Sequence, residues 1–360
     1  EEEEEEKAPP KKKAKTKKND GPIARSATPR RQVAATGTYK ILSVNVAGLR
    51  ATLNPEKGKA ALFRSVVEQE DPDLLLLNEH KLKEEDVEGV EEILDALLPA
   101  YAHRRFACST AKKGYSGVAA LSKLPLSVAA EDFPGNAFPD EGRFLHLTLP
   151  SPSGVSVFAV YVPNSGQQLD RLEARVKPGG WDRSLERYAA SVDGSVLVIG
   201  DLNVAHGVSD IHNFYARPNF DDLLAEDNAT DAESYEPQYK GLTAIKKQAG
   251  LTAKERASFT ALLEGAGVVD SFRHFHPSAH GCFSYYSQRA VQNRPANKGL
   301  RLDYVLASNA LLSSSSSSSG DDDGKDPALL DSFILDKDPA FSDHVPVGCV
   351  LRLPSSSSSS

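Results

Sequence analysis

A run of four apolar residues followed at once by polar ones constrains the fold of this chain most strongly. Residues 196–199 read Val-Leu-Val-Ile, which predicts a buried strand. Gly200 permits a sharp exit from this strand, and Asp201, Asn203 and His206 follow it. Since α/β proteins place their chemistry where strands end and loops begin, we expect a functional site at this turn. A polar turn that only caps the next element is the alternative for this stretch taken alone.

Polar side chains also stand at the ends of other predicted strands. The predicted strands cover residues 39–46, 74–77, 118–121, 144–147, 155–160, 302–306 and 345–351. The polar residues at their ends are Asn45, Glu79, Tyr161, Asn164, Asp303, Asp343 and His344. Helical patterns cover 56–70, 84–98, 168–190 with a break at 178–180, and 251–264 with a capping box from Thr252 to Glu255. Strands outnumber helices and several connections are short, which favours mixed sheets packed on each other with helices outside.

The 360 residues are not all expected to fold. Residues 1–38 contain almost no large apolar side chains, so we expect a disordered charged tail there and a serine tail over 354–360. One catalytic domain is expected over 39–353, with loop insertions at 207–250 and 313–330. A connection as long as 207–250 inside a compact domain indicates a functional or a disordered segment.

Composition restricts the class of protein only loosely. The net charge of −8 argues mildly against a nucleic-acid binder, although a site built from carboxylates would also make the chain acidic. Cys108, Cys282 and Cys349 form no CxxC pair, which argues against a disulfide framework or a zinc site and favours a reducing compartment. No apolar run approaches the ~20 residues of a membrane span. The basic run over 11–18 resembles a nuclear localisation cluster, with a merely solvated tail as the alternative.

Taken together, the polar residues at the strand ends supply what metal-assisted phosphodiester cleavage requires. Glu79 and Asp343 offer hard oxygen ligands of the kind that Mg²⁺ prefers. Asp201 is expected to orient or deprotonate a water molecule, and Asp303 to orient a charged histidine. The donors for negative charge developing on phosphate are Asn203, Tyr161 and His344. Each residue alone has an ordinary alternative as a surface or turn residue, so the hypothesis depends on the joint pattern.

Ten short motifs occur along the chain in a distinctive order. They are Ser-Val-Asn-Val-Ala-Gly-Leu-Arg-Ala at 43–51, Asn-Glu-His-Lys-Leu at 78–82, Gly-Tyr-Ser-Gly-Val at 114–118, Glu-Gly-Arg-Phe at 141–144, Tyr-Val-Pro-Asn-Ser-Gly at 161–166, Trp-Asp at 181–182, Gly-Asp-Leu-Asn-Val-Ala-His at 200–206, Asp-Ser-Phe-Arg at 270–273, Arg-Leu-Asp-Tyr at 301–304 and Ser-Asp-His at 342–344. In these motifs the chain resembles the exonuclease III-like apurinic/apyrimidinic (AP) endonucleases of the endonuclease/exonuclease/phosphatase superfamily, over about residues 39–353.

The resemblance implies a fold and an activity. The fold would be a four-layer α/β sandwich, in which two packed mixed β-sheets are flanked by helices. The activity would be that of a Mg²⁺-dependent AP endonuclease of base excision repair, with Mn²⁺ as an alternative metal. Such an enzyme cleaves double-stranded DNA 5′ to an abasic site, and a 3′-exonuclease or 3′-phosphodiesterase side activity is expected. The resemblance also implies a monomer without membrane association, located in the nucleus or an organelle.

The resemblance implies a role for each matching residue as well. The metal site would contain Glu79, Asn45 and Asp343. The catalytic residues would be Asp201, Asn203, Tyr161, Asp303 and His344. DNA would contact Lys81, Tyr115, Arg143, Asn164, Arg171, Tyr285, Tyr286, Leu300 and Arg301, with Tyr285, Tyr286 and Leu300 lining the pocket for the flipped baseless sugar.

The chain departs from the family pattern at five positions. Ala47 stands where the family has Asp or Asn near the metal. Asn78 and His80 replace a Gln and a Thr, and Tyr286 and Leu300 replace tryptophans. These changes affect the expected affinity for the metal and the expected fit of the baseless sugar in its pocket. The alternatives are therefore a weakly active or non-catalytic DNA-binding repair protein, or another phosphodiesterase of the superfamily.

Overall fold

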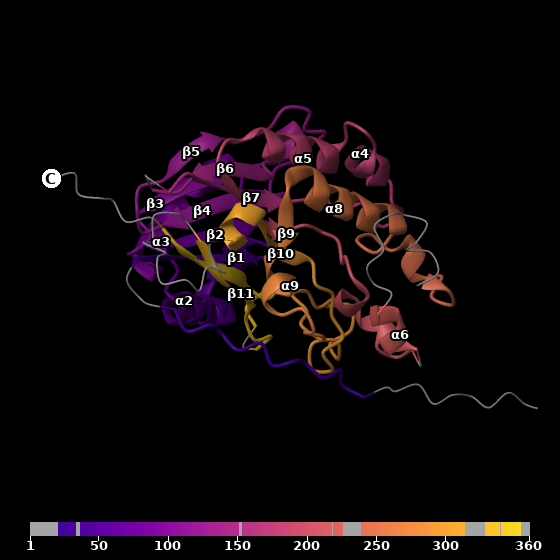
Figure 1. The fold of residues 1–360 in the computed structure, drawn as a ribbon. Helices are drawn as coiled ribbons and strands as arrows, with labels where there is room; N and C mark the ends of the chain where they lie inside the picture. Colours follow the sequence, from indigo (N-terminus) through magenta and orange to yellow (C-terminus); the bar gives the residue numbers. More distant parts are fainter. Residues whose placement is uncertain are drawn as a thin grey trace, which may run out of the picture.

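The structure is a computed structural model that describes residues 21–33, 37–150, 153–217, 219–225, 239–313, 328–338 and 340–353. Within these residues the strands form two six-stranded mixed sheets (Figure 1). The first sheet has the order β11 (Ala328–Ile334), β12 (Val347–Arg352), β1 (Thr38–Asn45), β2 (Leu74–Asn78), β4 (Val118–Ser122) and β3 (His103–Ala107). The second has the order β5 (Ser127–Ala130), β6 (Phe144–Thr148), β7 (Val155–Tyr161), β8 (Ser195–Asp201), β10 (Asp303–Ser308) and β9 (Val268–Asp270).

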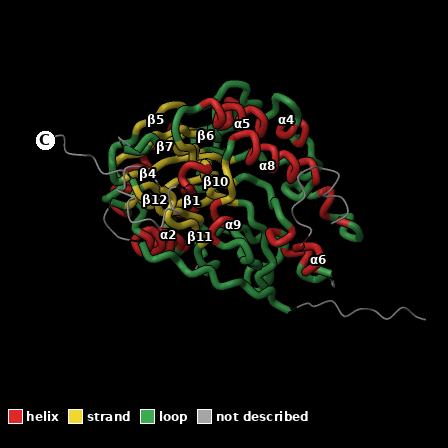
Figure 2. Tube along the Cα trace, viewed as in Figure 1, coloured by secondary structure: helices red, strands yellow, loops and turns green. Residues whose placement is uncertain are grey.

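The two sheets pack against each other, and helices cover their outer faces (Figure 2). α1 (Leu49–Leu53), α2 (Lys59–Glu70) and α3 (Val87–Leu97) cover the first sheet. α4 (Leu172–Val176), α5 (Trp181–Ser191) and α8 (Ala253–Ala266) lie on the side of the second. The remaining described helices are α6 (Phe220–Ala225), α9 (Ser271–Phe275) and α10 (Asn309–Ser313). The expected four-layer α/β sandwich is confirmed.

The central strands β2 and β8 are almost continuously apolar because both faces of each strand are covered. In β8, Leu197 and Ile199 point into the core between the sheets, whereas Val196 and Val198 point toward the helices. In β2, Leu74 and Leu76 face the other sheet and the two leucines between and after them face α2 and α3. A strand that is covered on both faces needs apolar residues at every position, because neither face meets water. The run over 196–199 was therefore a sound predictor of a central strand.

Most expected elements agree with the structure. The helix expected over 168–190 is divided into α4 and α5 by the predicted break, because Gly179 adopts a φ of +79°. The capping box of Thr252 and Glu255 is present at the start of α8. Four strands were not expected from the sequence: β3, β5, β9 and β11. β11 begins at Ala328, so the last three residues of the loop expected over 313–330 belong to a strand, and residues 314–327 lie outside the described residues.

The expected disordered tail needs a correction for residues 21–33, which lie along the domain. Arg25 Nη2 donates to the carbonyl of Ile334 at 2.8 Å, and the Ser26 amide donates to His280 O at 2.9 Å. Arg30 pairs with Asp331 at 3.0 Å. Arginine side chains supply these polar contacts, and Ile23 and Val33 pack against the core, so the low overall hydrophobicity of the segment misled the prediction. The expectations for 1–20, 34–36 and 354–360 lie outside the described residues, as does the basic run over 11–18.

The 207–250 connection carries short helical turns and a small core in its described parts. Val208, Ile211 and Phe214 pack with Tyr239 and Ile245 in one buried cluster. Residue 218 and residues 226–238 lie outside the described part of this connection. No helix among the described residues of the chain combines the length and apolarity needed to cross a bilayer.

Candidate active site

The register of the second sheet brings three of the expected site residues into one row. Tyr161 of β7 is the parallel partner of Asp201 of β8, and Asp201 is the antiparallel partner of Asp303 of β10. Directly opposed residues project from the same face of a sheet. This row ends at the edge of the inter-sheet core, where Asn45 of β1 and Asn78 of β2 form the matching pair in the first sheet. The site therefore lies where strand ends of both sheets meet.

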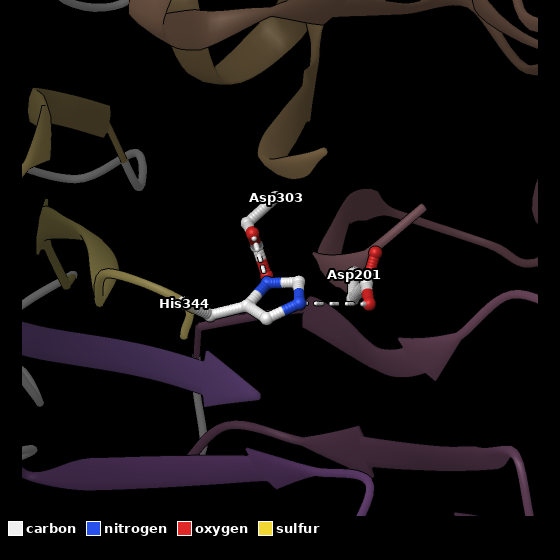
Figure 3. Close-up of side chains that lie close together, drawn as sticks. All are labelled: Asp201, Asp303 and His344. Atoms are coloured by element: carbon white, nitrogen blue, oxygen red, sulfur yellow. Dashed lines mark hydrogen bonds and ion pairs between the residues drawn. The ribbon is translucent and has the colours of Figure 1, made fainter. Parts of the chain in front are cut away.

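His344 lies between the two aspartates of this row (Figure 3). Its Nδ1 is 2.8 Å from Asp303 Oδ2, and its Nε2 is 3.9 Å from Asp201 Oδ2. Burial alone would lower the pKa of His344, but the charges of Asp303 and Asp201 outweigh it and raise the pKa. The imidazole is therefore held in its charged form at neutral pH. Asp303 Oδ1 is buried and has no hydrogen-bond partner among the described residues.

Asp201 is prepared to act as a base. Burial, followed by the charge of Asp303, raises the pKa of Asp201 above its usual range. The backbone amide of Asn203 donates to Asp201 Oδ1 at 2.9 Å, and Asn45 Nδ2 donates to Oδ2 at 2.9 Å. These two bonds fix the orientation of the carboxylate, so that one oxygen faces the His344 ring. A buried, oriented carboxylate with a raised pKa is suited to accept a proton from water.

Asn45 links Asp201 to Glu79 by hydrogen bonds. Its Nδ2 donates to Glu79 Oε2 at 2.9 Å as well as to Asp201, while its Oδ1 accepts from the Ala47 amide at 2.9 Å. Two carboxylates require a donor between them, so this orientation of the amide is dictated by its partners. Asn45 thus orients Glu79 and Asp201, and its expected role as a metal ligand stays a prediction.

Glu79 is the carboxylate best suited to a divalent cation. Its Oε1 is 2.7 Å from Lys81 Nζ, and its side chain is partly exposed. Burial would raise the pKa of Glu79, but Lys81 and Asn45 lower it, so the group is a charged oxygen ligand. Asp343 is also half-buried, and its Oδ1 accepts from Ser342 Oγ at 3.3 Å. Mg²⁺ typically takes one or two carboxylates and keeps several waters, which this donor set can satisfy.

A second group of oxygen and nitrogen ligands lies beside Glu79. The side chains of Asp201, Asp303 and His344 have potential ligand atoms that all lie within 4.8 Å of one another. His344 in its charged form cannot bind a metal, because both ring nitrogens carry protons. The three residues therefore fit a hydrogen-bonded acid–base group better than a metal site in which all three would be ligands.

The backbone around the site is strained. Five non-glycine residues there have positive φ: Ala47 (51°), Glu79 (56°), Lys81 (56°), Ser116 (54°) and Asn203 (49°). Such conformations persist only where the surrounding structure enforces them, and they cluster at functional sites. Gly117 serves the same region, because a Cβ there would lie 2.4 Å from the His80 ring. His80, which replaces the family threonine, accepts from the Leu82 amide at 3.0 Å and thereby shapes the turn after Glu79.

Tyr161, Asn203 and Asn164 form a group of donors beside the base. Burial and the charges of Glu79 and Asp201 raise the pKa of Tyr161, so its hydroxyl remains protonated. Asn203 Nδ2 donates to Val162 O at 2.8 Å, and its Oδ1 accepts from Asn164 Nδ2 at 2.9 Å. The second hydrogen of the Asn203 amide is the one suited to a phosphate oxygen.

Tyr115, Arg143 and Arg171 form one hydrogen-bonded cluster near Tyr161. The Tyr115 hydroxyl accepts from Arg143 Nη2 at 3.0 Å and from Arg171 Nη1 at 2.6 Å. Both guanidinium groups also bond to Glu141. Arg143 is 2% exposed and its guanidinium lies over the Tyr161 ring, so its expected contact with DNA is corrected to a role in holding Tyr161 and Tyr115. Lys81, Tyr115, Asn164 and Arg171 keep some exposure.

Three other expected DNA contacts lie inside the protein. Arg301 is 1% exposed and forms ion pairs with Asp210 and Asp270. Tyr286 is 2% exposed, and its hydroxyl donates to Asn297 Oδ1. Leu300 is 5% exposed in the core of the 207–250 connection. These three expectations are corrected, because their side chains do not reach the surface; Tyr285 does lie at the site, 4.9 Å from His344 between ring centroids.

Arg175 is a site residue that sequence reasoning missed. It is 2% exposed, and it donates to the carbonyls of Leu202 and Asn203 at 2.7 and 2.8 Å while its Nε contacts Asp182. Arg175 thus fixes the turn that carries Asn203. One feature of the sequence could have indicated this role. Arg175 stands three residues after Leu172 and therefore on the same buried face of α4, where a charged side chain requires buried partners.

Comparison with known proteins agrees with this geometry. Residues 42–344 match the endonuclease/exonuclease/phosphatase family. The DNA repair nuclease APEX1 of Danio rerio is 32% identical over 349 residues, which cover 94% of this chain and 91% of that protein. The exodeoxyribonuclease of Bacillus subtilis is 30% identical over 316 residues, which cover 87% of this chain and all of that protein. The crystal structure of the AP endonuclease LMAP of Leishmania major superposes with a TM-score of 0.67 at 27% identity, covering 94% of this chain and 96% of that one.

Proposed function

The chain belongs to the endonuclease/exonuclease/phosphatase family and is a phosphodiester hydrolase, and we propose that it cleaves double-stranded DNA 5′ to an abasic site. The products are a 3′-hydroxyl and a 5′-deoxyribose phosphate, as in base excision repair. The single observation that carries the proposal is the row of Asp201, His344 and Asp303, in which a buried base faces a charged imidazole. Asp201 ends β8 and Asp303 begins β10 in the second sheet, and His344 lies just before β12 of the first.

The residues divide the work of hydrolysis between them. Asp201 takes a proton from the attacking water and holds that water by a hydrogen bond. His344, kept charged by Asp303, donates through Nε2 to a phosphoryl oxygen on which negative charge grows. Tyr161 and Asn203 donate to further phosphate oxygens. Donors fixed before the reaction stabilise the transition state without reorganising, which is the largest usual contribution in this type of catalysis.

The proposed metal is Mg²⁺, with Mn²⁺ as the alternative. Glu79 and Asp343 would hold it, because both are carboxylates on the solvent side of the row. A bound divalent cation supplies positive charge to the phosphate and the leaving oxygen. Lys81, which now contacts Glu79, contributes a second positive charge at the same place.

Abasic specificity, a monomeric state and a nuclear location complete the proposal. Extruding a nucleotide without a base costs less than extruding a paired one, which favours the abasic position. The Tyr285 ring lies 4.9 Å from the His344 ring between centroids, which supports Tyr285 as the aromatic residue that meets an extruded sugar. The two relatives are named for DNA repair and for exodeoxyribonuclease activity. The proposal therefore includes a 3′-exonuclease or 3′-phosphodiesterase side activity.

The test is cleavage of two matched duplexes by the full chain. One duplex carries a single tetrahydrofuran abasic analogue and the other is intact, and each is incubated with Mg²⁺ or with EDTA. Metal-dependent cutting at the 5′ side of the analogue alone supports the proposal. Binding of the abasic duplex without cutting would favour the non-catalytic repair protein, and equal cutting of both duplexes would favour a non-specific nuclease.

A further inference from the structure

The segment 284–286 connects the two loops that carry Asp303 and His344. Tyr285 forms β-bridges with Leu300 on one side and with His344 on the other. The Tyr286 amide donates to Asp343 O at 2.9 Å. The segment therefore acts as a short central strand between the residues entering β10 and those entering β12. Both members of the Asp303–His344 pair are held by this one piece of backbone.

Ser284 makes the contacts that fix the spacing of this pair. Its hydroxyl oxygen accepts from two consecutive backbone amides, those of Leu302 at 2.9 Å and Asp303 at 3.0 Å. Its carbonyl oxygen accepts from the Val345 amide, next to His344, at 2.7 Å. Ser284 is completely buried. One residue thus bonds to the backbone of Asp303 and to the peptide group that follows His344.

We propose that Ser284 is a positioning residue for the Asp303–His344 pair, acting through its hydroxyl on the backbone of β10. The inference rests on the proposed hydrolase function and goes beyond it, because Ser284 touches neither Asp201 nor the position of the substrate. The two amides that Ser284 accepts lie at the point where β10 begins. Without the Ser284 hydroxyl, the amides of Leu302 and Asp303 lose their acceptor in a fully buried position. Because an unpaired buried amide is costly, we expect the backbone to shift until the two amides find other partners.

A shift of the Asp303 backbone acts on catalysis through His344. The bond from His344 Nδ1 to Asp303 Oδ2 sets the direction in which Nε2 faces Asp201. A displacement of about 1 Å in a catalytic group typically costs about 100-fold in rate. Ser284 should therefore affect the chemical step more than the binding of DNA, since its hydroxyl bonds to the backbone of Leu302 and Asp303. Of the proposed DNA contacts, Tyr285 shares its segment, whereas Lys81, Tyr115, Asn164 and Arg171 lie on other segments.

The experiment compares Ser284→Ala with Ser308→Ala in the full chain. Ser308 lies at the opposite end of the same strand, and its hydroxyl likewise accepts from a backbone amide, that of Val196 at 2.7 Å. Single-turnover cleavage of the abasic duplex gives the rate of the chemical step. Titration with the same duplex in the presence of EDTA, where cleavage is blocked, gives the Kd for DNA. We expect Ser284→Ala to lower the rate by about 100-fold with Kd within about twofold, and Ser308→Ala to leave both close to wild type.

Two readouts do not depend on activity. Hydrogen exchange of the Leu302 and Asp303 amides should accelerate by roughly tenfold or more in Ser284→Ala alone. The downfield proton resonance of the His344 Nδ1–H that is bonded to Asp303 should broaden or disappear. Ser284→Thr, which keeps the hydroxyl, should restore this resonance and most of the rate. If Ser284→Ala does not fold, the same comparison is made between Ser284→Cys and Ser284→Thr, with loss expected only for the thiol, a weak acceptor.

The results that overturn the inference are distinct from a failure of the proposed function. A rate within about threefold of wild type in Ser284→Ala, an unchanged resonance, or equal losses in the Ser308 variant would each exclude a positioning role. If the wild-type chain does not cleave abasic DNA, the function fails, while the exchange and resonance measurements still decide whether Ser284 sets the Asp303–His344 geometry.

Discussion

Asp201 and Asp303 are direct partners across the antiparallel ladder between β8 and β10. Their side chains therefore project from the same face of the sheet, where repulsion between two carboxylates would normally be unfavourable. His344 relieves it by contacting both, at 2.8 Å from Asp303 and 3.9 Å from Asp201. The pairing of the two strands thus creates the arrangement on which the proposed chemistry depends.

Asp201→Asn should lower the cleavage rate by about 10²–10⁴-fold, because an amide cannot accept the proton of water. Affinity for the abasic duplex should be preserved, since asparagine has nearly the same shape. Single-turnover rates and Kd in EDTA measure the two effects. Asp193→Asn, in the exposed turn that precedes β8, is the matched control and should behave as wild type. Loss of binding together with cleavage would identify Asp201 as structural.

The pH dependence of the chemical step should be bell-shaped. Asp201 must be deprotonated to act, and burial together with Asp303 raises its pKa to about 7, so the rate should fall as the pH drops below that value. His344 must be charged, and the two aspartates raise its pKa to about 10 against the effect of burial, so the rate should fall as the pH rises past that value.

Asp303→Asn supplies the check on this assignment. Removing one negative charge should move both limbs of the profile to lower pH, because Asp303 raises the pKa of both groups. The measurement is the single-turnover rate from pH 5 to pH 10 in wild type and variant. If both limbs of the pH–rate profile stay at the wild-type pH in Asp303→Asn, groups other than Asp201 and His344 control the rate.

Ala47→Asp should lower the Mg²⁺ concentration for half-maximal rate, by about tenfold. The Ala47 amide donates to Asn45, which in turn donates to Glu79, so Ala47 lies near the proposed metal ligand. Its φ of +51° is one that Asp and Asn tolerate better than most residues. The substitution therefore adds an oxygen ligand without backbone strain. Ala47→Asn, which fits the same backbone without adding charge, should have a smaller effect. An unchanged Mg²⁺ titration in both variants would place Ala47 away from the metal.

Acid should destabilise the fold partly through His80. Burial lowers the pKa of His80 to about 4, whereas in the unfolded chain it is about 6.5. The unfolded state therefore binds the extra proton, and stability is lost as the pH falls from about 6.5 to about 4, at about 1.4 kcal/mol per pH unit. Urea unfolding at several pH values should give a shallower dependence for His80→Asn than for wild type. The exposed His274→Asn should keep the wild-type slope; equal slopes in all three would contradict the account.

The central strands could be predicted from the sequence and the edge strands could not. β3 and β11 bound the first sheet, and β5 and β9 bound the second. Central strands covered on both faces show as continuous apolar runs, whereas β3 begins His-Arg-Arg and β9 has only three residues. An edge strand is specified by its single neighbour, which a local pattern does not reveal.

The proximity of Asp201, Asp303 and His344 could be predicted from the sequence, but the positions of several neighbouring side chains could not. The motifs led us to expect Asp201, Asp303 and His344 in one site, and the structure brings their side chains together, while their catalytic role stays a prediction. They did not show the direction of Arg301 or Tyr286, both of which turn inward to buried partners. A motif fixes which residues recur together, but whether a long side chain meets DNA or an internal aspartate depends on contacts with distant segments, such as Asp210 and Asn297.

The most direct measurement is the single-turnover cleavage rate of His344→Ala on an abasic duplex with saturating Mg²⁺. His344 is the residue that joins both aspartates, so removing its ring should lower the rate by at least about 10²-fold while DNA binding persists. His274→Ala, on the exposed face of α9, should cleave at the wild-type rate. A near-normal rate for His344→Ala would contradict the account, because the Asp201–His344–Asp303 row could then not be the catalytic centre.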